Sequence, residues 1–192
     1  MQTLETMPQI GGLAEVKGAA KPPVHLWNPP FCGDIDMRIA ADGTWYYLGT
    51  PITRAPMVRL FSSILRKDPG RFVLVTPVEM VGIVVEDAPF IATEMSIDGV
   101  GHSRRLLFRT NVEDEVVADE THPIRFERQA NDGFKPYVMV RDGLWAKLTR
   151  SLYAELVDHG EIVETAAGRI FGVFGQNSFF PIAPADELEF DA

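Results

Sequence analysis

The stretch Asp42-Gly43-Thr44-Trp45 decides how we divide this chain, because Asp142-Gly143-Leu144-Trp145 repeats it downstream. Each copy is followed by a Thr-Arg pair and then, past an amphipathic stretch, by a Gly-Arg step into an apolar run. The matched positions are Thr53-Arg54 and Thr149-Arg150, then Gly70-Arg71 and Gly168-Arg169. This order predicts a duplication that yields two related units. A cleft between two units is a common place for a small ligand.

The residues on either side of the first copy predict a β-hairpin. Three apolar residues alternate with polar ones before it, which is the period of a half-buried strand. They are Ile35, Met37 and Ile39. Asp42-Gly43 has the chemistry of a tight hairpin turn, so residues 45–48 are expected to form the returning strand.

A helix and a strand are predicted to complete this first domain. The helix begins at Pro56, since proline is tolerated in the first turn and apolar residues follow at one-face spacing. Those residues are Met57, Leu60, Phe61, Ile64 and Leu65. Asp68-Pro69-Gly70 is expected to end the helix, and residues 72–75 form a short buried strand. Residues 25–78 are therefore predicted to be a small α+β domain.

Residues 79–192 are predicted to form a larger, β-rich domain with one helix. Short apolar stretches separated by turn residues indicate antiparallel strands. They cover 81–85, 90–97, 105–110, the region of 116–117, 124–128, 137–140, 162–164 and 170–174. The apolar positions of the helix are Trp145, Leu148, Leu152, Leu156 and Val157. Residues 1–24 show little periodicity and are expected to form a flexible N-terminal arm.

Composition restricts the function and the compartment. The formal net charge of −9 argues against a nucleic-acid polymer as partner, because phosphate binding depends on clustered Lys and Arg. Cys32 is the single cysteine, so no intrachain disulfide can form and a reducing cytoplasm is the expected location. The chain shows no secretory signal and no apolar run of membrane-spanning length, so no membrane partner is expected.

Three segments together resemble a bacterial family catalogued as domain of unknown function 1285. They are residues 32–38, 42–52 and 74–79, and the resemblance extends over about residues 31–182. It implies a two-domain α+β protein with an internally repeated motif and a C-terminal domain loosely similar to pleckstrin-homology-like barrels. It also implies a ligand site between the domains, but no activity and no catalytic residue.

Polar residues on the predicted hairpin form the first candidate site. Cys32, Asp34 and Asp36 alternate and could face one side of a strand, but their spacing matches no metal-ligand signature. The favoured interpretation is a partly exposed strand edge whose carboxylates pair with Arg38 or Arg54. Asp36 with Arg38 and Tyr47 could serve acid–base chemistry, although no partner geometry is recognisable.

The glycine-rich segment from Gly99 to Arg105 is the second candidate site. His102, Arg104 and Arg105 lie there beside backbone amides that could form an anion-binding nest. The alternative is a simple hairpin turn whose arginines pair with nearby carboxylates.

Matched residues of the two repeats form the third candidate site. Arg54 and Arg150 occupy equivalent positions and could hold a phosphate or carboxylate across an interface between the units. The favoured alternative is that each caps or salt-bridges its own unit. Trp45 could stack on a flat ligand at a cleft, but a core position is favoured for it and for Trp145.

We therefore expect a cytoplasmic, non-catalytic regulatory or signal-transduction protein that binds a small anionic ligand, such as a nucleotide, at the inter-domain cleft. No cofactor is expected, and a protein partner or homodimer stays open. Two alternatives remain. One is an enzyme of unrecognised class at the same cleft, using the region of Asp36, Arg38 and His102. The other is a pleckstrin-homology-like protein-interaction module.

Overall fold

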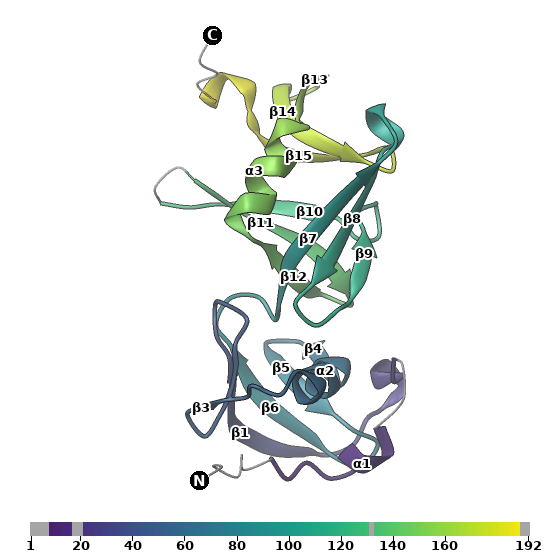
Figure 1. Ribbon diagram of the computed structural model, residues 1–192, viewed down its shortest axis with the longest axis vertical. Coiled ribbons are helices and arrows are strands. Elements are labelled where there is room, and N and C mark those ends of the chain that lie inside the picture. Colours follow the sequence, from purple (N-terminus) through teal and green to yellow (C-terminus); the bar gives the residue numbers. More distant parts are fainter. Residues whose placement is uncertain (1–7, 17–20, 131–132, 189–192) are drawn as a thin grey trace. The chain divides into compact units, whose positions relative to one another are not determined.

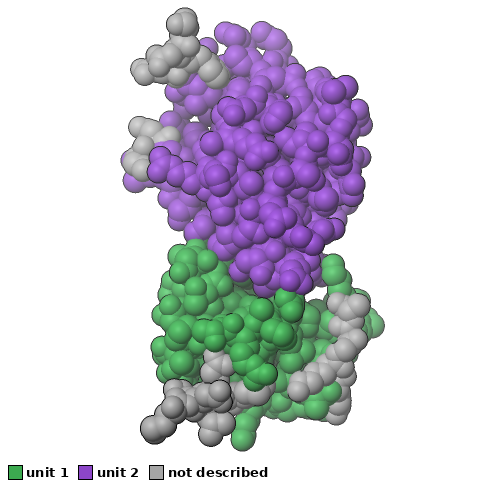
Figure 2. Space-filling model, viewed as in Figure 1, with its two compact units in different colours: residues 1–89 green, residues 90–192 purple. Residues whose placement is uncertain are grey.

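The computed structural model describes residues 8–16, 21–130 and 133–188. The chain divides into two compact units, residues 1–89 and 90–192, which Figure 2 shows in separate colours. Both are built mainly of β-strands in curled sheets, and each carries a nine-residue α-helix, so the protein is a two-domain α+β structure. Among the described residues, no helix is long and apolar enough to cross a membrane.

The first unit contains one six-stranded sheet, with the strand order β3-β2-β1-β6-β5-β4 (Figure 1). The strands are β1 (Phe31–Ile39), β2 (Trp45–Tyr47), β3 (Thr50–Pro51), β4 (Leu65–Asp68), β5 (Arg71–Val75) and β6 (Met80–Val85). The predicted hairpin is confirmed, since β1 and β2 are antiparallel and Ile39 pairs with Trp45. At its turn, the amide of Thr44 donates to the Asp42 carboxylate at 2.9 Å, and Gly43 has a φ of 85°.

Helix α2 (Ala55–Ser63) covers the buried face of this sheet. Met57 and Phe61 point into the core, and the Phe61 ring stacks on the Trp45 indole. The helix ends before the predicted limit, because Leu65 already belongs to β4 and pairs with Leu74 of β5. The segment Asp68-Pro69-Gly70 therefore turns a hairpin instead of ending a helix, with Gly70 at a φ of 79°.

Part of the N-terminal segment packs on the first unit, contrary to the expectation of a flexible arm. Helix α1 (Leu13–Val16) and the residues before it bury Ile10, Leu13 and Val16. The Gly11 amide donates to Glu79 Oε2 at 2.9 Å, and the Thr76 hydroxyl donates to the Gly11 carbonyl at 2.7 Å. Residues 1–7 and 17–20 lie outside the described residues.

The second unit contains a six-stranded sheet in the order β10-β11-β12-β7-β8-β9 and a three-stranded sheet in the order β13-β14-β15. The larger sheet consists of β7 (Phe90–Asp98), β8 (Arg105–Thr110), β9 (Glu115–Val117), β10 (Ile124–Arg128), β11 (Phe134–Arg141) and β12 (Leu144–Leu148). The smaller consists of β13 (Glu161–Thr165), β14 (Gly168–Gly175) and β15 (Ser178–Pro184). The other elements are α3 (Arg150–Asp158) and the 3-10 turns η2 (Gly101–Ser103) and η3 (Ala185–Glu187), with η1 (Val24–Leu26) in the first unit.

The predicted strands of this unit are present, but its helix is shorter than expected. Trp145 and Leu148 lie on β12, where buried and half-buried residues alternate, and α3 begins only after Thr149. The Thr149 hydroxyl caps the helix by accepting from the Leu152 amide. Strand β15 was not predicted. The units divide between residues 89 and 90, rather than at residue 78, because β6 pairs with β1 and β5.

Candidate functional site

The first predicted site lies on the β1–β2 hairpin. Arg38 pairs across the strands with Tyr46, and its guanidinium carbon lies 4.0 Å from the centre of the Tyr46 ring. The same guanidinium donates to Glu86 Oε1 at 2.7 Å. Tyr47 is the next residue along β2 and so points to the opposite face of the hairpin. Arg38 therefore shares a face with Tyr46, and the combination predicted with Tyr47 is not assembled.

Trp45 is a core residue of the first unit. Its side chain is 1% exposed, and its ring lies 6.2 Å from the Phe61 ring at an interplanar angle of 25°. The indole is therefore occupied by packing, as the favoured interpretation expected. Its Nε1 atom has no hydrogen-bond partner among the described residues.

The glycine-rich loop between β7 and β8 is fastened to the three-stranded sheet by Arg104. Gly99 and Gly101 have φ values of 82° and 65°, which glycine adopts without strain. Arg104 Nε donates to the Gly101 carbonyl at 2.7 Å, and its Nη1 donates to the His159 carbonyl at 3.1 Å. Its Nη2 also lies 3.5 Å from Glu161 Oε1, and the side chain is 14% exposed. The Arg104 guanidinium is therefore occupied by contacts that hold the loop in place.

His102 makes a second contact between the same loop and the same sheet. Its ring stacks on Phe174, with the ring centres 3.7 Å apart, and its Nε2 lies 3.2 Å from Glu161 Oε2. The loop thus holds its conformation through His102 and Arg104. It leaves Arg105 exposed at the start of β8, opposite Asp98 in the strand register.

Three predicted arginines have exposed guanidinium groups with no partner among the described residues: Arg54, Arg105 and Arg150. Arg54 precedes α2, and its side chain makes no capping hydrogen bond. Arg150 is the first residue of α3, where Thr149 supplies the cap. The expectation that Arg54 and Arg150 would each cap or salt-bridge its own unit therefore has no support in these contacts.

An arginine that the sequence analysis missed lies on the outer face of the large sheet in the second unit. The Arg125 guanidinium carbon is 4.2 Å from the centre of the Trp145 ring and 5.0 Å from that of Tyr137. Its Nη2 also lies 3.0 Å from Glu127 Oε1. The pairing of Arg125 with Tyr137 in the β10–β11 register, not any sequence motif, creates this arrangement.

The displaced pKa values belong to residues outside the predicted sites. Hydrogen bonds from the Thr44 amide and hydroxyl lower the pKa of Asp42. Burial by itself would raise the pKa of Asp119, but hydrogen bonds from Thr121 and His122 outweigh it and leave that pKa lowered. Burial raises the pKa of the Tyr153 hydroxyl. These shifts accompany turns and packing, so none of them points to acid–base chemistry at a predicted site.

Potential metal ligands do not gather in the described part of the chain. No group of three His, Cys, Asp or Glu residues there could hold a metal ion. Cys32 is exposed, and its thiol contacts only the Pro30 carbonyl, at 3.6 Å, among the hydrogen-bond partners described. Asp34 faces Gly82 of the neighbouring strand β6.

Comparison with known proteins identifies both units. Residues 22–88 match the model "Domain of unknown function (DUF1285), N-terminal domain", and residues 89–182 match "Protein of unknown function (DUF1285), C-terminal domain". No curated protein matches the chain. A DUF1285 family protein from Silicibacter pomeroyi DSS-3 has a similar crystal structure, with 51% identity, a TM-score of 0.86, and coverage of 92% of this chain and 95% of that chain.

A second solved structure is more distant. A DUF1285 family protein from Shewanella baltica OS155 shares 31% identity with a TM-score of 0.51, covering 65% of this chain and 91% of that chain. The matched segments span both units, and the resemblance seen in the sequence is confirmed. The chain belongs to the DUF1285 family.

Proposed function

We propose that this protein is a non-catalytic regulatory protein that binds a small anionic ligand through exposed arginines. The observation that carries the proposal is that Arg54, Arg105 and Arg150 have no partner among the described residues, in a chain with a net charge of −9. Arginine offers a planar fork of donors that matches phosphate and carboxylate groups. A nucleotide or a phosphorylated metabolite has the chemistry that such groups recognise.

The placement of two of these arginines favours binding over a local structural role. Arg54 and Arg150 stand at the N-terminal ends of α2 and α3, where the helix dipole is positive. A cation there costs about 0.3–1 kcal/mol, so neither residue stabilises its own helix. An anion at the same place would be attracted by the arginine and by the helix end together. Anion binding would therefore explain why arginines stand at these two helix ends, where they do not stabilise the helices.

An internal duplication would explain why the two arginines match. Each unit contains a hairpin with an Asp-Gly turn, then a nine-residue helix, then a second hairpin. The parallel pairings of the two sheets differ. In the first unit the first strand of the Asp-Gly hairpin, β1, pairs with β6, whereas in the second unit the second strand of the hairpin, β12, pairs with β7. We infer that the duplicated feature is the hairpin–helix–hairpin segment alone, with the sheets completed differently in each unit.

An enzyme is the less favoured alternative. It would use Asp36, Arg38 and His102, but Arg38 already pairs with Glu86 and His102 is stacked on Phe174. An interaction module is the other alternative, and the curled six-stranded sheet with α3 is what supports a pleckstrin-homology-like second unit. It predicts binding of a protein instead of a small anion.

Thermal denaturation with a panel of nucleotides, sugar phosphates and inorganic phosphate tests the proposal. A ligand present at 100 times its Kd stabilises by about 2.7 kcal/mol, which raises the Tm of a chain this size by roughly 5–10 °C. Arg54→Ala, Arg105→Ala and Arg150→Ala are expected to reduce the shift. Arg109→Ala is the matched control, because Arg109 is exposed but lies 3.6 Å from both Glu94 and Glu115.

Two results would contradict the proposal. One is the absence of any Tm shift with every anion of the panel. The other is a shift that survives in the triple variant lacking Arg54, Arg105 and Arg150. A shift lost equally in the Arg109 control would show general charge screening, which also contradicts a specific site.

A further inference from the structure

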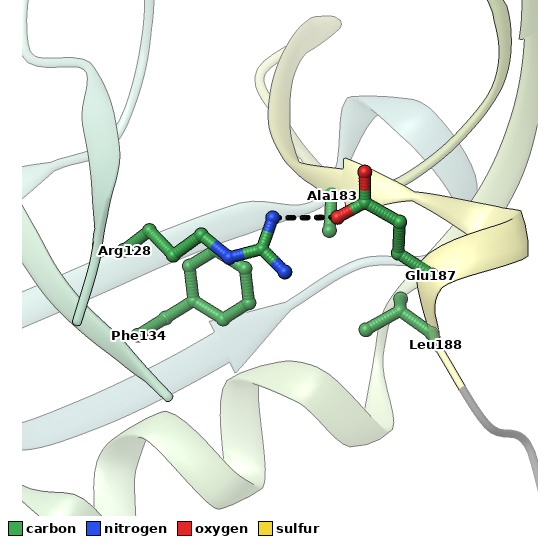
Figure 3. Close-up of a pocket in the computed structure, with 5 residues that line it drawn as sticks. All are labelled: Arg128, Phe134, Ala183, Glu187 and Leu188. Carbon is green, nitrogen blue, oxygen red and sulfur yellow. Dashed lines mark hydrogen bonds and ion pairs between the residues drawn. The ribbon is translucent and has the colours of Figure 1, made fainter. Parts of the chain in front are cut away.

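A pocket in the second unit has charged groups that are already engaged. Its volume is about 430 Å³, and Arg128 and Glu187 lie at its wall (Figure 3). Arg128 Nη1 donates to Glu187 Oε2 at 2.6 Å. The contacts of the N-terminal segment on the first unit are more informative, because they are made to a peptide backbone.

Residues 76–79, the turn between β5 and β6, hold this segment by both polar groups of one residue. The Gly11 amide donates to Glu79 Oε2 at 2.9 Å, and the Gly11 carbonyl accepts from the Thr76 hydroxyl at 2.7 Å. The turn is closed by the Thr76 amide, which donates to the Glu79 carbonyl at 2.9 Å, and Thr76 is fully buried. Residues 76–79, which we call the 76–79 cradle, therefore offer one acceptor and one donor to a bound backbone.

The 76–79 cradle selects glycine at two consecutive positions. A Cβ on Gly11 would lie 2.6 Å from Glu79 Oε2, and a Cβ on Gly12 would lie 2.9 Å from Val78 Cγ2. Gly12 also has a φ of 72°, a conformation that favours glycine. The apolar residues on either side of the two glycines are buried: Ile10 and Leu13. The cradle thus fits a segment with the pattern apolar-Gly-Gly-apolar.

The cradle and its occupant belong to different parts of the chain. The match to the DUF1285 N-terminal domain begins at residue 22, so residues 76–79 lie inside that domain and residues 8–16 lie outside it. The occupant contains one short helix of four residues, α1, which is too short to be stable by itself. Its order therefore depends on the docking contacts, and a terminal segment held in this way opens more readily than the core.

We propose that the 76–79 cradle is a binding site for an apolar-Gly-Gly-apolar segment, and that the N-terminal segment of a second copy of this chain can replace residues 8–16 in it. The contacts are the same whether the segment comes from the same chain or from the other copy. The chain's own segment competes at an effective concentration on the order of millimolar, so it suppresses the exchange while it is intact. Weakening that segment opens the cradle to the second copy.

A fluorescently labelled peptide of residues 8–16 tests whether the cradle accepts a segment from another molecule. Fluorescence polarisation measures its binding to the full chain and to the full-length Gly12→Ala variant, in which the chain's own segment fits poorly. Gly12→Ala is expected to bind the peptide at least about tenfold more tightly than the parent, because its cradle is free for more of the time. Ala14→Gln is the matched control and should bind like the parent, since Ala14 is exposed on the same segment.

Three results would overturn the proposed site. One is peptide binding by Gly12→Ala that is no tighter than binding by the parent. Another is equally tight binding of a peptide that has alanine in place of Gly12. The third is the absence of binding to Gly12→Ala with the protein in the millimolar range. If circular dichroism shows that Gly12→Ala fails to fold, Gly11→Ala takes its place, because its Cβ would crowd the Glu79 carboxylate.

Mixing two full-length variants tests the second copy as the occupant. Glu79→Ala keeps the natural segment but lacks an acceptor of the cradle, whereas Gly12→Ala keeps the cradle but has an impaired segment. The mixture is expected to form a complex with one copy of each variant, and sedimentation velocity with one variant labelled would detect it. Absence of this complex at concentrations where the peptide binds would overturn the second copy as the occupant. So would equal complex formation with Ala14→Gln in place of Gly12→Ala.

Discussion

Replacing Trp45 by phenylalanine tests the packing of the first unit. The indole is 1% exposed, stacks on Phe61, and carries an Nε1–H group without a hydrogen-bond partner among the described residues. A buried donor left unpaired costs about 1–3 kcal/mol. Phenylalanine removes this donor but keeps an aromatic ring against Phe61. The substitution therefore has one stabilising and one destabilising effect.

The two effects nearly cancel in magnitude. The smaller ring gives up roughly 1–2 kcal/mol of packing, a fraction of the 3–5 kcal/mol that removing a whole buried aromatic side chain costs. Relief of the unpaired N–H group offsets most of that loss. We expect Trp45→Phe to change the free energy of unfolding by less than about 1 kcal/mol, and Trp45→Ala to lower it by about 3–5 kcal/mol.

Amide hydrogen exchange followed by mass spectrometry is the appropriate assay. Peptides that cover β1 and β5 report the opening free energy of the first unit, separately from the second. Peptides from β11 and β12 serve as an internal reference and should not change. If Trp45→Phe is as damaging as Trp45→Ala, the Nε1–H group makes a bond in solution and the reasoning is refuted.

Three further predictions concern the second unit. Gly172→Ala is expected to lower stability by about 1–3 kcal/mol, because the new Cβ would clash with the Phe180 carbonyl oxygen; an unchanged Tm would show that the strands have more room. Thr149→Ala should cost about 1 kcal/mol through loss of the α3 cap, and chemical denaturation that shows no difference would contradict it. The lowered pKa of Asp119 means that its carboxylate stabilises the fold above the unfolded pKa of about 3.9, and that this contribution is lost as pH falls through the folded pKa. Asp119→Ala is therefore expected to be about 1 kcal/mol less stable than the parent at neutral pH, and the difference should shrink as pH falls through the folded pKa of Asp119, as Tm measured across pH would show. Glu120→Ala, at the exposed neighbouring position, should match the parent throughout, and a pH-independent loss in Asp119→Ala would refute the linkage.

Local patterns predicted most of the secondary structure correctly. Asp42-Gly43 does form the predicted hairpin turn, because glycine supplies the positive φ that such a turn requires. The alternation of Ile35, Met37 and Ile39 indicated a strand with one buried face, and residues of β1 have that pattern. These features depend on neighbours within a few positions, so the sequence carries them directly.

Helix ends and strand faces were harder to predict. Leu65 and Trp145 both fit helical spacing, yet each lies on a strand because a partner strand takes up its backbone hydrogen bonds. Tyr46, and not Tyr47, accompanies Arg38, since the pairing register of the hairpin decides which residue shares a face. Apolar residues alone do not distinguish these outcomes when the run is short.

The sequence by itself determined the family, the division into two α+β units, the turn at Asp42-Gly43 and the net negative charge. Only the tertiary structure decided which arginines have carboxylates beside them. It joins Arg104 to His159 and Glu161, and Arg128 to Glu187, across more than fifty positions of chain. Such partners meet because strands from distant segments pair and stack. A local sequence pattern does not show which distant segments will meet. The same folding leaves Arg54, Arg105 and Arg150 in solvent, where an anion can reach them.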